Sequence, residues 1–243
     1  MKKVIIAILC ICAFIACTAI GFLSGDLSIS PTKPVASTTR NSQRPAGTPQ
    51  YRNQQNLVFI QVGNLTESRP RLESAWLMLY MPNQPDLTLL MLYPSTKEPY
   101  SKLADKFKLS PSGDLDSGFN NALLSFGFGY QGFILIDETG FTQWIDWLGG
   151  VDVGSGKQDG AAVLNQLTKP WSDIANAVTR QKITSTSICN VTSLLPLETD
   201  WSSLLVKLMP DHLLTNLSLQ DTVTIWQQMK DGQARFKCVV LTP

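Results

Sequence analysis

Residues 133–153 read FILIDETGFTQWIDWLGGVDV, and this run gives the strongest structural signal in the chain. Its first residues belong to a short apolar segment, residues 132–136, of the kind found in buried strands. After Asp137 the apolar residues recur at i, i+3, i+4 and i+7, which predicts a helix with one apolar face. These residues are Phe141, Trp144, Ile145 and Leu148. The pair Gly149-Gly150 is expected to end this helix, so a buried strand leads directly into an amphipathic helix, as in α/β domains.

The rest of the chain repeats this alternation of strands and helices. Residues 57–62 (LVFIQV) predict a buried strand, and residues 75–81 and 87–93 predict a hairpin around the turn PNQPD. Helices are expected at 116–126, 160–167, 174–183 and 201–208, and a final strand at 235–241. The sequence SLQD at 218–221 is a capping box that opens one more helix. Apolar strands interleaved with helices predict a mixed β-sheet that is flanked by helices on both faces.

Charge and histidine content exclude several functions. The 243 residues include 20 Lys and Arg and 19 Asp and Glu, and the net charge of +1 argues against a nucleic-acid partner. His212 is the only histidine, so the chain has no His-rich zinc site and no H-E-x-x-H motif. We expect His212 to be a solvated loop residue. The sequence GSGK at 154–157 lacks the first glycine and the Ser or Thr of a P-loop, which predicts a polar surface loop.

The N-terminus predicts export from the cytoplasm. Lys2 and Lys3 precede an uncharged apolar run at residues 4–23, which is long enough to span a bilayer. Three segment types share this pattern: a retained transmembrane anchor, a cleaved signal peptide, and a lipoprotein signal that would leave Cys17 lipidated as the first residue. Each of them places the rest of the chain outside the cytoplasm. We therefore expect a cell-membrane location, with a single N-terminal anchor and an extracytoplasmic domain.

Composition divides the chain into three parts. Residues 1–23 are the anchor or signal segment, residues 24–55 are a Ser-, Thr- and Pro-rich flexible linker, and residues 56–243 form the α/β domain. Only Cys189 and Cys238 lie in the exported domain. An oxidising compartment is compatible with a disulfide between them, while two buried free thiols are the alternative.

Several motifs in order resemble the LytR–CpsA–Psr domain, also called the cell envelope-related transcriptional attenuator domain. Residues 133–153 resemble its segment in which a strand ending in Asp leads to a G-F helix and then to D-x-L-G-G-V-D-V. Residues 56–63 (NLVFIQVG) resemble its opening strand, and residues 159–164 (DGAAVL) resemble its D-G-x-x-A-L helix start. Arg180-Gln181 resembles its R-Q pair, and residues 215–218 (TNLS) resemble its closing helix cap. The resemblance covers residues 56–243.

This resemblance implies a mixed α/β sheet with a long apolar cavity for a polyprenyl chain. Enzymes of the family transfer a glycopolymer from a polyprenyl pyrophosphate to a hydroxyl of the cell wall. In such enzymes arginines and an Asp-bound Mg²⁺ neutralise the pyrophosphate. By resemblance, Arg69, Arg71 and Arg180 are the candidate pyrophosphate-binding residues, and Arg180 is the candidate catalytic residue.

Several charged positions of the family are neutral in this chain. Ser74 stands where the family has its metal-binding Asp, and Thr168 and Ala177 stand where it has arginines. The Pro-Arg-Asp after the third strand is replaced by Pro94-Ser95-Thr96. These changes predict a non-catalytic homologue that binds a polyprenyl lipid or a glycopolymer, with neither metal nor cofactor. The alternative is a divergent, Mg²⁺-dependent phosphotransferase that uses five residues: Arg69, Arg71, Glu73, Asp173 and Arg180.

Overall fold

The computed structural model describes residues 54–82, 84–127, 129–168, 173–230 and 235–242. The chain divides into two units, residues 1–43 and 44–243, and the described residues all belong to the second unit. The predicted anchor, most of the predicted linker and Cys17 lie outside the described residues. Within the described ranges, no helix combines the length and the apolar character that a membrane span requires.

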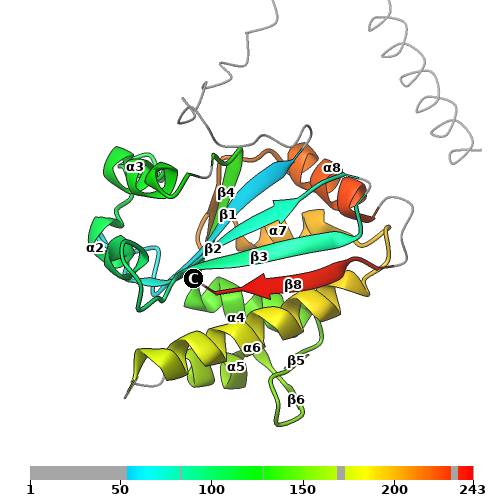
Figure 1. Ribbon diagram of the computed structural model, residues 1–243. Coiled ribbons are helices and arrows are strands. Elements are labelled where there is room, and N and C mark those ends of the chain that lie inside the picture. Colours follow the sequence, from blue (N-terminus) through cyan, green and yellow to red (C-terminus); the bar gives the residue numbers. More distant parts are fainter. Residues whose placement is uncertain (1–53, 83, 128, 169–172, 231–234, 243) are drawn as a thin grey trace, which may run out of the picture. The chain divides into compact units, whose positions relative to one another are not determined.

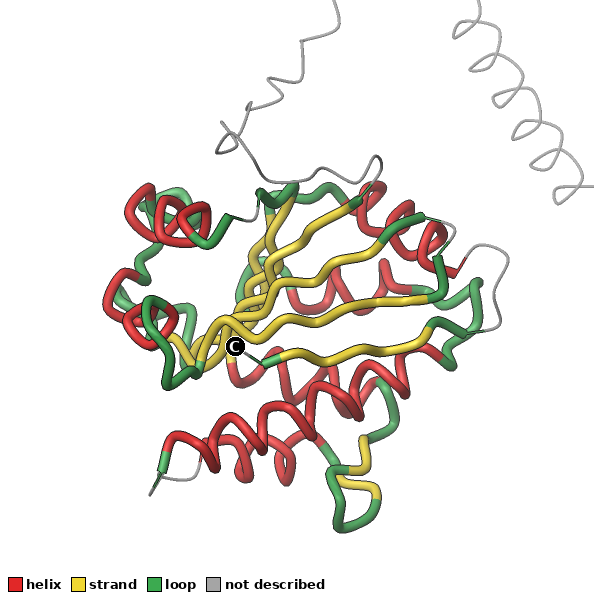
Figure 2. Tube along the Cα trace, in the orientation of Figure 1, coloured by secondary structure: helices red, strands yellow, loops and turns green. Residues whose placement is uncertain are grey.

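A six-stranded mixed sheet forms the centre of the described domain, in the order β7-β4-β1-β2-β3-β8 (Figures 1 and 2). The strands β4–β1 and β3–β8 pair in parallel, and the other neighbours pair antiparallel. The predicted hairpin forms β2 and β3, and the predicted closing strand forms β8. The bounds are β1 (Gln55–Val62), β2 (Leu72–Tyr80), β3 (Asp86–Tyr93), β4 (Gly132–Asp137), β7 (Leu213–Thr215) and β8 (Lys237–Leu241).

Helices cover both faces of this sheet, as the sequence predicts. One face packs on α2 and α3 through a cluster that includes Phe107, Phe119 and Leu123. The other face packs on α4, α5, α7 and α8, and α6 runs beside β8 (Figure 1). The helix bounds are η1 (Tyr100–Lys102), α2 (Leu103–Lys106), α3 (Ser117–Ser125), α4 (Glu138–Trp147), α5 (Gly160–Thr168), α6 (Ile174–Ser193), α7 (Trp201–Leu208) and α8 (Leu219–Lys230).

The junction of β4 and α4 shows how local sequence sets this arrangement. Asp137 ends β4 in an extended conformation, and its carboxylate accepts a hydrogen bond of 2.8 Å from the backbone N–H of Gly140, which caps α4. Gly140 has no side chain, and a Cβ there would lie only 2.6 Å from the backbone oxygen of His212. The glycine therefore permits α4 to begin directly against the segment that leads into β7.

The disulfide fixes α6 to the sheet edge. Cys189 on α6 and Cys238 on β8 are bonded, with their Cα atoms 6.1 Å apart. Cys238 is in register with Leu87 at the start of β3, so the covalent link lies at the end of the sheet where β3 begins. It closes a loop between positions 49 apart in the chain and ties the longest described helix to the last strand.

Two features differ from the sequence-based predictions. The helix predicted to end at residue 183 continues to Ser193, because its second half packs one side on the sheet through Thr184, Ile188 and Cys189. The short strands β5 (Val151–Asp152), β6 (Lys157–Gln158) and β7 were not predicted. The GSGK segment lies at the exposed turn between β5 and β6, where Gly154 and Gly156 have positive φ, so the predicted polar surface loop is confirmed.

Candidate functional site

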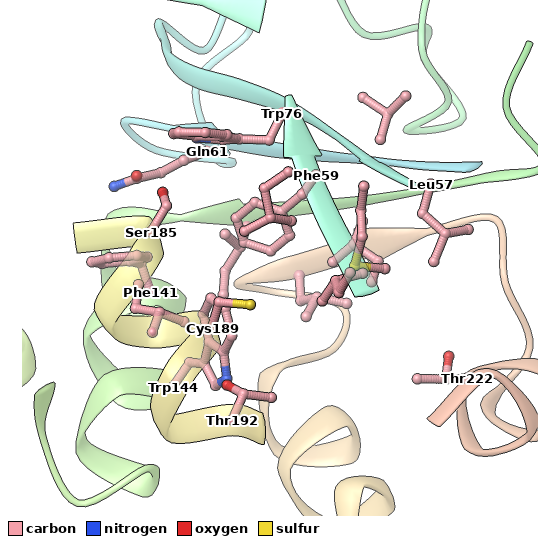
Figure 3. A pocket seen from close by; sticks show the side chains of 18 of the residues that line it. Leu57, Phe59, Gln61, Trp76, Phe141, Trp144, Ser185, Cys189, Thr192 and Thr222 are labelled. Atoms are coloured by element: carbon pink, nitrogen blue, oxygen red, sulfur yellow. The ribbon is translucent and has the colours of Figure 1, made fainter. Parts of the chain in front are cut away.

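An apolar cavity of about 220 Å³ lies between the sheet and the helices α4, α6, α7 and α8 (Figure 3). Alternate residues of the central strands supply one wall, as the period of a β-strand requires. They are Leu57, Phe59 and Gln61 on β1, Ser74, Trp76 and Met78 on β2, and Ile134 and Ile136 on β4. Every second residue of these strands thus faces the cavity, while residues between them, such as Ile60 and Leu135, belong to the core on the other face.

Aromatic rings form much of the helical wall. The ring of Trp144 lies 5.5 Å from that of Phe59, measured between centroids. The ring of Trp201 lies 4.9 Å from that of Trp147 in a tilted arrangement and 5.2 Å from that of Trp226 in an edge-to-face arrangement. Rings at these separations attract one another beyond the area they bury, so they hold the wall in place without filling the space between sheet and helices.

The polar groups of the cavity are all neutral. None of the described residues that line it is Asp, Glu, Lys, Arg or His. Gln61 and Ser74 lie opposite each other in the β1–β2 register, and the Ser74 hydroxyl donates to Gln61 Oε1 at 3.5 Å. Gln181 on α6 lines the same cavity and is only 5 % exposed. The cavity therefore offers amides and hydroxyls to a ligand, and no charge.

Four of these buried polar atoms have no hydrogen-bond partner among the described residues. They are Gln61 Nε2, Trp144 Nε1, Thr192 Oγ1 and Trp201 Nε1, and all four residues line the cavity. Buried polar groups in proteins are nearly always paired, so unpaired ones that gather in one cavity indicate a place for a bound molecule. No pattern in the sequence indicated this group, because its members come from four separate elements.

A second cavity, of about 420 Å³, contains two of the cationic residues that the resemblance singled out. Its lining consists of Arg69, Pro70, Arg71, Leu72, Glu73, Tyr93, Ala104, Asp105, Phe107 and Thr168. Arg71 Nε lies 2.5 Å from Glu73 Oε1, and its Nη2 lies 3.9 Å from Glu138 Oε1. The guanidinium of Arg71 is therefore already neutralised by carboxylates of the protein.

The pKa values around this ion pair reflect burial. Burial raises the pKa of Glu73, Arg71 opposes this shift, and the nearby Glu138 adds to it. Burial also raises the pKa of Glu138, and again Arg71 acts in the opposite direction. The pKa of the Tyr93 hydroxyl is raised by burial and by the charge of Glu73. In their ionised form, Glu73 and Glu138 would repel an added phosphate.

The structure brings together only part of the predicted pyrophosphate site. Arg69, Arg71 and Glu73 line the second cavity, and Thr168, which stands at a family arginine position, lines it with them. Arg180 lies on α6 with its Nε buried, but it is not among the described residues that line either cavity. Asp173 is exposed and caps α6 by accepting a hydrogen bond of 3.0 Å from the N–H of Ala175.

Glu73 and Ser74 line different cavities although they are adjacent in the chain. Ser74 lines the apolar cavity and Glu73 lines the second one. The β1–β2 register shifts at this point, between Gln61 and Val62, which marks a β-bulge. Since neighbouring side chains of a strand point to opposite faces, the Glu73 carboxylate lies on the other side of the strand from Ser74, where the family has its Asp.

His212 is not the solvated loop residue that the sequence predicted. Its Nδ1 lies 3.0 Å from Oδ2 of Asp137, whose side chain is 3 % exposed, and the His212 side chain is itself only 33 % exposed. One oxygen of the Asp137 carboxylate thus contacts the His212 ring, and the other accepts a hydrogen bond from the Gly140 N–H. The contact joins the start of α4 to the segment before β7, which is a tertiary pairing with no local sequence signal.

Sequence comparisons find no match, whereas structural comparisons find proteins with a similar fold. No family model matches the chain, and no curated protein matches it. TagV from B. subtilis superposes with a TM-score of 0.58 at 13% identity, over 79% of this chain and 85% of that one. TagT bound to LIIa-WTA gives 0.55 at 12% identity, over 84% and 85%. The protein gbs0355 from Streptococcus agalactiae gives 0.56 at 15% identity, over 78% and 77%.

These likenesses show the fold. TagV and TagT have the LytR–CpsA–Psr fold, so the fold expected from the sequence motifs is confirmed. At such low identity the superposition does not transfer an activity to this chain. The chemistry of its own cavities has to supply the argument for function.

Proposed function

We propose that this chain is an extracytoplasmic cell-envelope protein that binds the apolar chain of a polyprenyl lipid and does not transfer a glycopolymer. The observation that supports this most directly is the composition of the apolar cavity. Its lining is aliphatic and aromatic, as a lipid chain requires, and no described residue of that lining is charged. TagT, which has the same fold, is known in complexes with LI-WTA and LIIa-WTA. A glycopolymer is therefore the second partner class that we propose for this chain.

The electrostatics support binding without catalysis. Phosphoryl transfer requires cations that stabilise the charge of the pyrophosphate as it develops. Here Arg71 is paired with Glu73 and Glu138, and Arg180 lies outside the described lining of both cavities. A site that lacks several cations supplies little of this stabilisation, so it is poorly suited to the chemistry.

The Mg²⁺ that the family resemblance implies does not fit the residues present. Among the described residues, no group of three or more His, Cys, Asp or Glu side chains is placed to hold a metal ion. Ser74 supplies only a hydroxyl where the family has a carboxylate, and Glu73 lines the second cavity. We therefore assign no metal-dependent step to this chain.

The test is lipid binding by the full-length protein extracted in detergent, followed by native mass spectrometry. We expect a polyprenyl pyrophosphate to be retained equally with and without Mg²⁺, through its apolar chain, and equally by wild type and Arg180→Ala. The matched control is Lys182→Ala, which removes an exposed cation from the same helix. Wild type that retains no lipid of any kind would refute the proposal.

A transferase is the second candidate, because Arg69, Arg71 and Glu73 do line one cavity. It predicts Mg²⁺-dependent release of polyprenyl phosphate from a glycan-loaded polyprenyl pyrophosphate when an acceptor glycan is supplied. The release would have to fall at least about tenfold in Arg71→Ala, as expected for loss of a cation that stabilises the transition state. Turnover that depends on Arg71 or Arg180 would establish this activity and overturn the non-catalytic proposal.

The membrane location is part of the same proposal. It is supported by the apolar residues 4–23 that follow Lys2 and Lys3. We expect the full chain to sediment with membranes and to be digested by protease added outside the cell. A variant without residues 2–23 should stay in the cytoplasm. Cys17→Ser separates the segment types, since only a lipoprotein would lose its lipid mass.

A further inference from the structure

One group of polar residues in the apolar cavity lies toward one end of the sheet, apart from Thr192 and Thr222, which line the cavity elsewhere (Figure 3). Cys189 on α6 is bonded to Cys238, which pairs with Leu87 at the start of β3, and this is the end where β1 begins. The earlier turns of α6 therefore run toward the other end, where Gln61 and Ser74 lie. Three polar residues on these turns also line the cavity: Gln181, Thr184 and Ser185. In Figure 3 the amide of Gln61 and the hydroxyl of Ser185 lie on the same side of the cavity.

Gln61 is the least satisfied member of this neutral polar end. The residue is 1 % exposed, its Oε1 accepts the Ser74 hydroxyl, and its Nε2 has no acceptor among the described residues. A buried N–H₂ group without an acceptor is unfavourable, because it has lost its hydrogen bonds to water. An oxygen atom of a bound molecule at this end would supply the missing acceptor.

The lack of charged residues in the described lining of the cavity decides which oxygen-bearing groups can bind there. A phosphate that enters the neutral end loses its hydration, and none of the described lining residues offers a cation in exchange. Arg71, which lines the second cavity, is held by Glu73 and Glu138. An alcohol oxygen carries no charge and loses far less hydration free energy, which it regains when it accepts from Gln61 Nε2 and donates to a neighbouring hydroxyl or amide oxygen.

From this geometry we propose that the lipid bound in the cavity is an uncharged long-chain alcohol, and that Gln61 is the residue that recognises its hydroxyl. This inference rests on the proposed lipid-binding function and narrows it, because a phosphorylated lipid becomes the weaker ligand. Gln61 selects by hydrogen bonding, while the apolar and aromatic walls hold the chain. A site built to hydrogen-bond a hydroxyl discriminates against an analogue that lacks it, because the buried polar group is then left unpaired.

The test compares four probes with the same fifteen-carbon chain: farnesol, farnesene, farnesyl phosphate and farnesyl pyrophosphate. The full-length protein in detergent is titrated with each, and the tryptophan fluorescence reports occupancy, because Trp76, Trp144, Trp201 and Trp226 line the cavity. We expect farnesol to bind roughly 3- to 10-fold more tightly than farnesene, the effect of one neutral hydrogen bond. Farnesyl phosphate and farnesyl pyrophosphate should bind at least about tenfold more weakly than farnesol.

The variant Gln61→Leu tests the assigned residue. It should abolish the preference for farnesol over farnesene and leave the binding of farnesene nearly unchanged. The matched control is Gln227→Leu, the same substitution at an exposed position of α8, which should behave as wild type. If Gln61→Leu does not fold, the order of the four probes on wild type still decides the question.

The outcomes separate this inference from the function on which it rests. Phosphorylated probes that bind as tightly as farnesol would overturn the preference for an alcohol, while lipid binding itself would stand. An unchanged ratio of farnesol to farnesene affinity in folded Gln61→Leu would overturn the role of Gln61. Failure of all four probes to bind would refute the proposed lipid-binding function and this inference with it.

Discussion

Removal of the Cys189–Cys238 disulfide should lower the free energy of unfolding by several kcal/mol. The bond joins α6 to β8, and it closes a chain segment between positions 49 apart. Without the bond, the unfolded chain regains the conformations that the closed loop excludes. Cys189 also lines the apolar cavity, so the same link holds the helix that forms one wall of that site.

The expected magnitude follows from the length of the closed loop. In the chain-entropy model, a loop of this length reduces the entropy of the unfolded state enough to contribute about 4 kcal/mol at 25 °C. Strain in the folded state and residual structure in the unfolded state reduce this value, so a measured loss of about 2–4 kcal/mol fits the model. Such a loss is a large part of the stability of a typical domain.

The assay is urea unfolding of the full-length protein in detergent, oxidised and after reduction. A second series uses the double variant Cys189→Ala with Cys238→Ala, which removes the bond without leaving thiols at these two positions. Reductant should destabilise the wild type and leave the double variant unaffected, which makes the double variant the control for reductant effects. The slope of free energy against urea should rise without the bond, because the unfolded state becomes more expanded.

A difference below about 1 kcal/mol between oxidised and reduced wild type would refute this reasoning, because it lies below the lower end of the loss expected for such a loop. It would mean that packing between α6 and β8 survives in the unfolded state, or that the bond adds as much strain as it removes entropy. The entropy argument would also be wrong if reductant destabilised the double variant to the same extent.

The remaining predictions concern a close backbone contact and two titrating groups. Gly160→Ala should destabilise the fold by about 1–3 kcal/mol in urea unfolding, because a Cβ would clash with the Thr142 backbone oxygen; stability equal to wild type would contradict this. The pKa of Glu73 is raised in the fold, so its folded form binds more protons than the unfolded form and stability falls as pH rises from about 4.5 toward neutrality. Glu73→Gln should reduce this loss of stability with rising pH. An unchanged dependence of the free energy of unfolding on pH would contradict the raised pKa of Glu73. Burial raises the pKa of Tyr80 to about 12, so the fold loses stability from this group between about pH 10 and 12. Absorbance titration should show that Tyr80→Phe lacks one tyrosine that ionises late in the wild type. Identical titration curves for the two proteins would refute the raised pKa.

Local pattern was sufficient for most elements of this fold. The strand β4, the helix α4 and the glycines after it follow from apolar spacing, the capping Asp137 and the change of period between strand and helix. The helix α7 begins and ends at the predicted residues, because its apolar residues share one face and Asp200 caps its start. The second half of α6 could not be predicted, because Thr, Ser, Cys and Val are weak helix formers that long-range packing on the sheet holds in place.

The candidate site was predictable only in part. The sequence motifs indicated the fold, an apolar cavity and the loss of charged residues, because these follow from residue identity at positions of a known pattern. They did not show that Arg69 and Arg71 lie with Glu73 in a cavity separate from Ser74, which depends on how segments far apart in the chain pack around the sheet. His212 was assigned to solvent because nothing near it in the sequence is a partner, whereas Asp137 lies 75 positions away.

The amino-acid sequence thus specifies which segments form strands and helices and where the motifs of the fold lie. It does so because periodicity, capping and turn chemistry act over a few residues. It also shows which charged positions of the family pattern are neutral in this chain. Whether polar side chains meet depends on contacts between distant segments, and those exist only once the sheet has formed. Gln61 and Ser74 become neighbours through the β1–β2 register, and Gln181 joins them in one cavity only because α6 packs along the sheet. The uncharged end of the cavity, on which the proposed ligand depends, is for this reason a property of the folded chain.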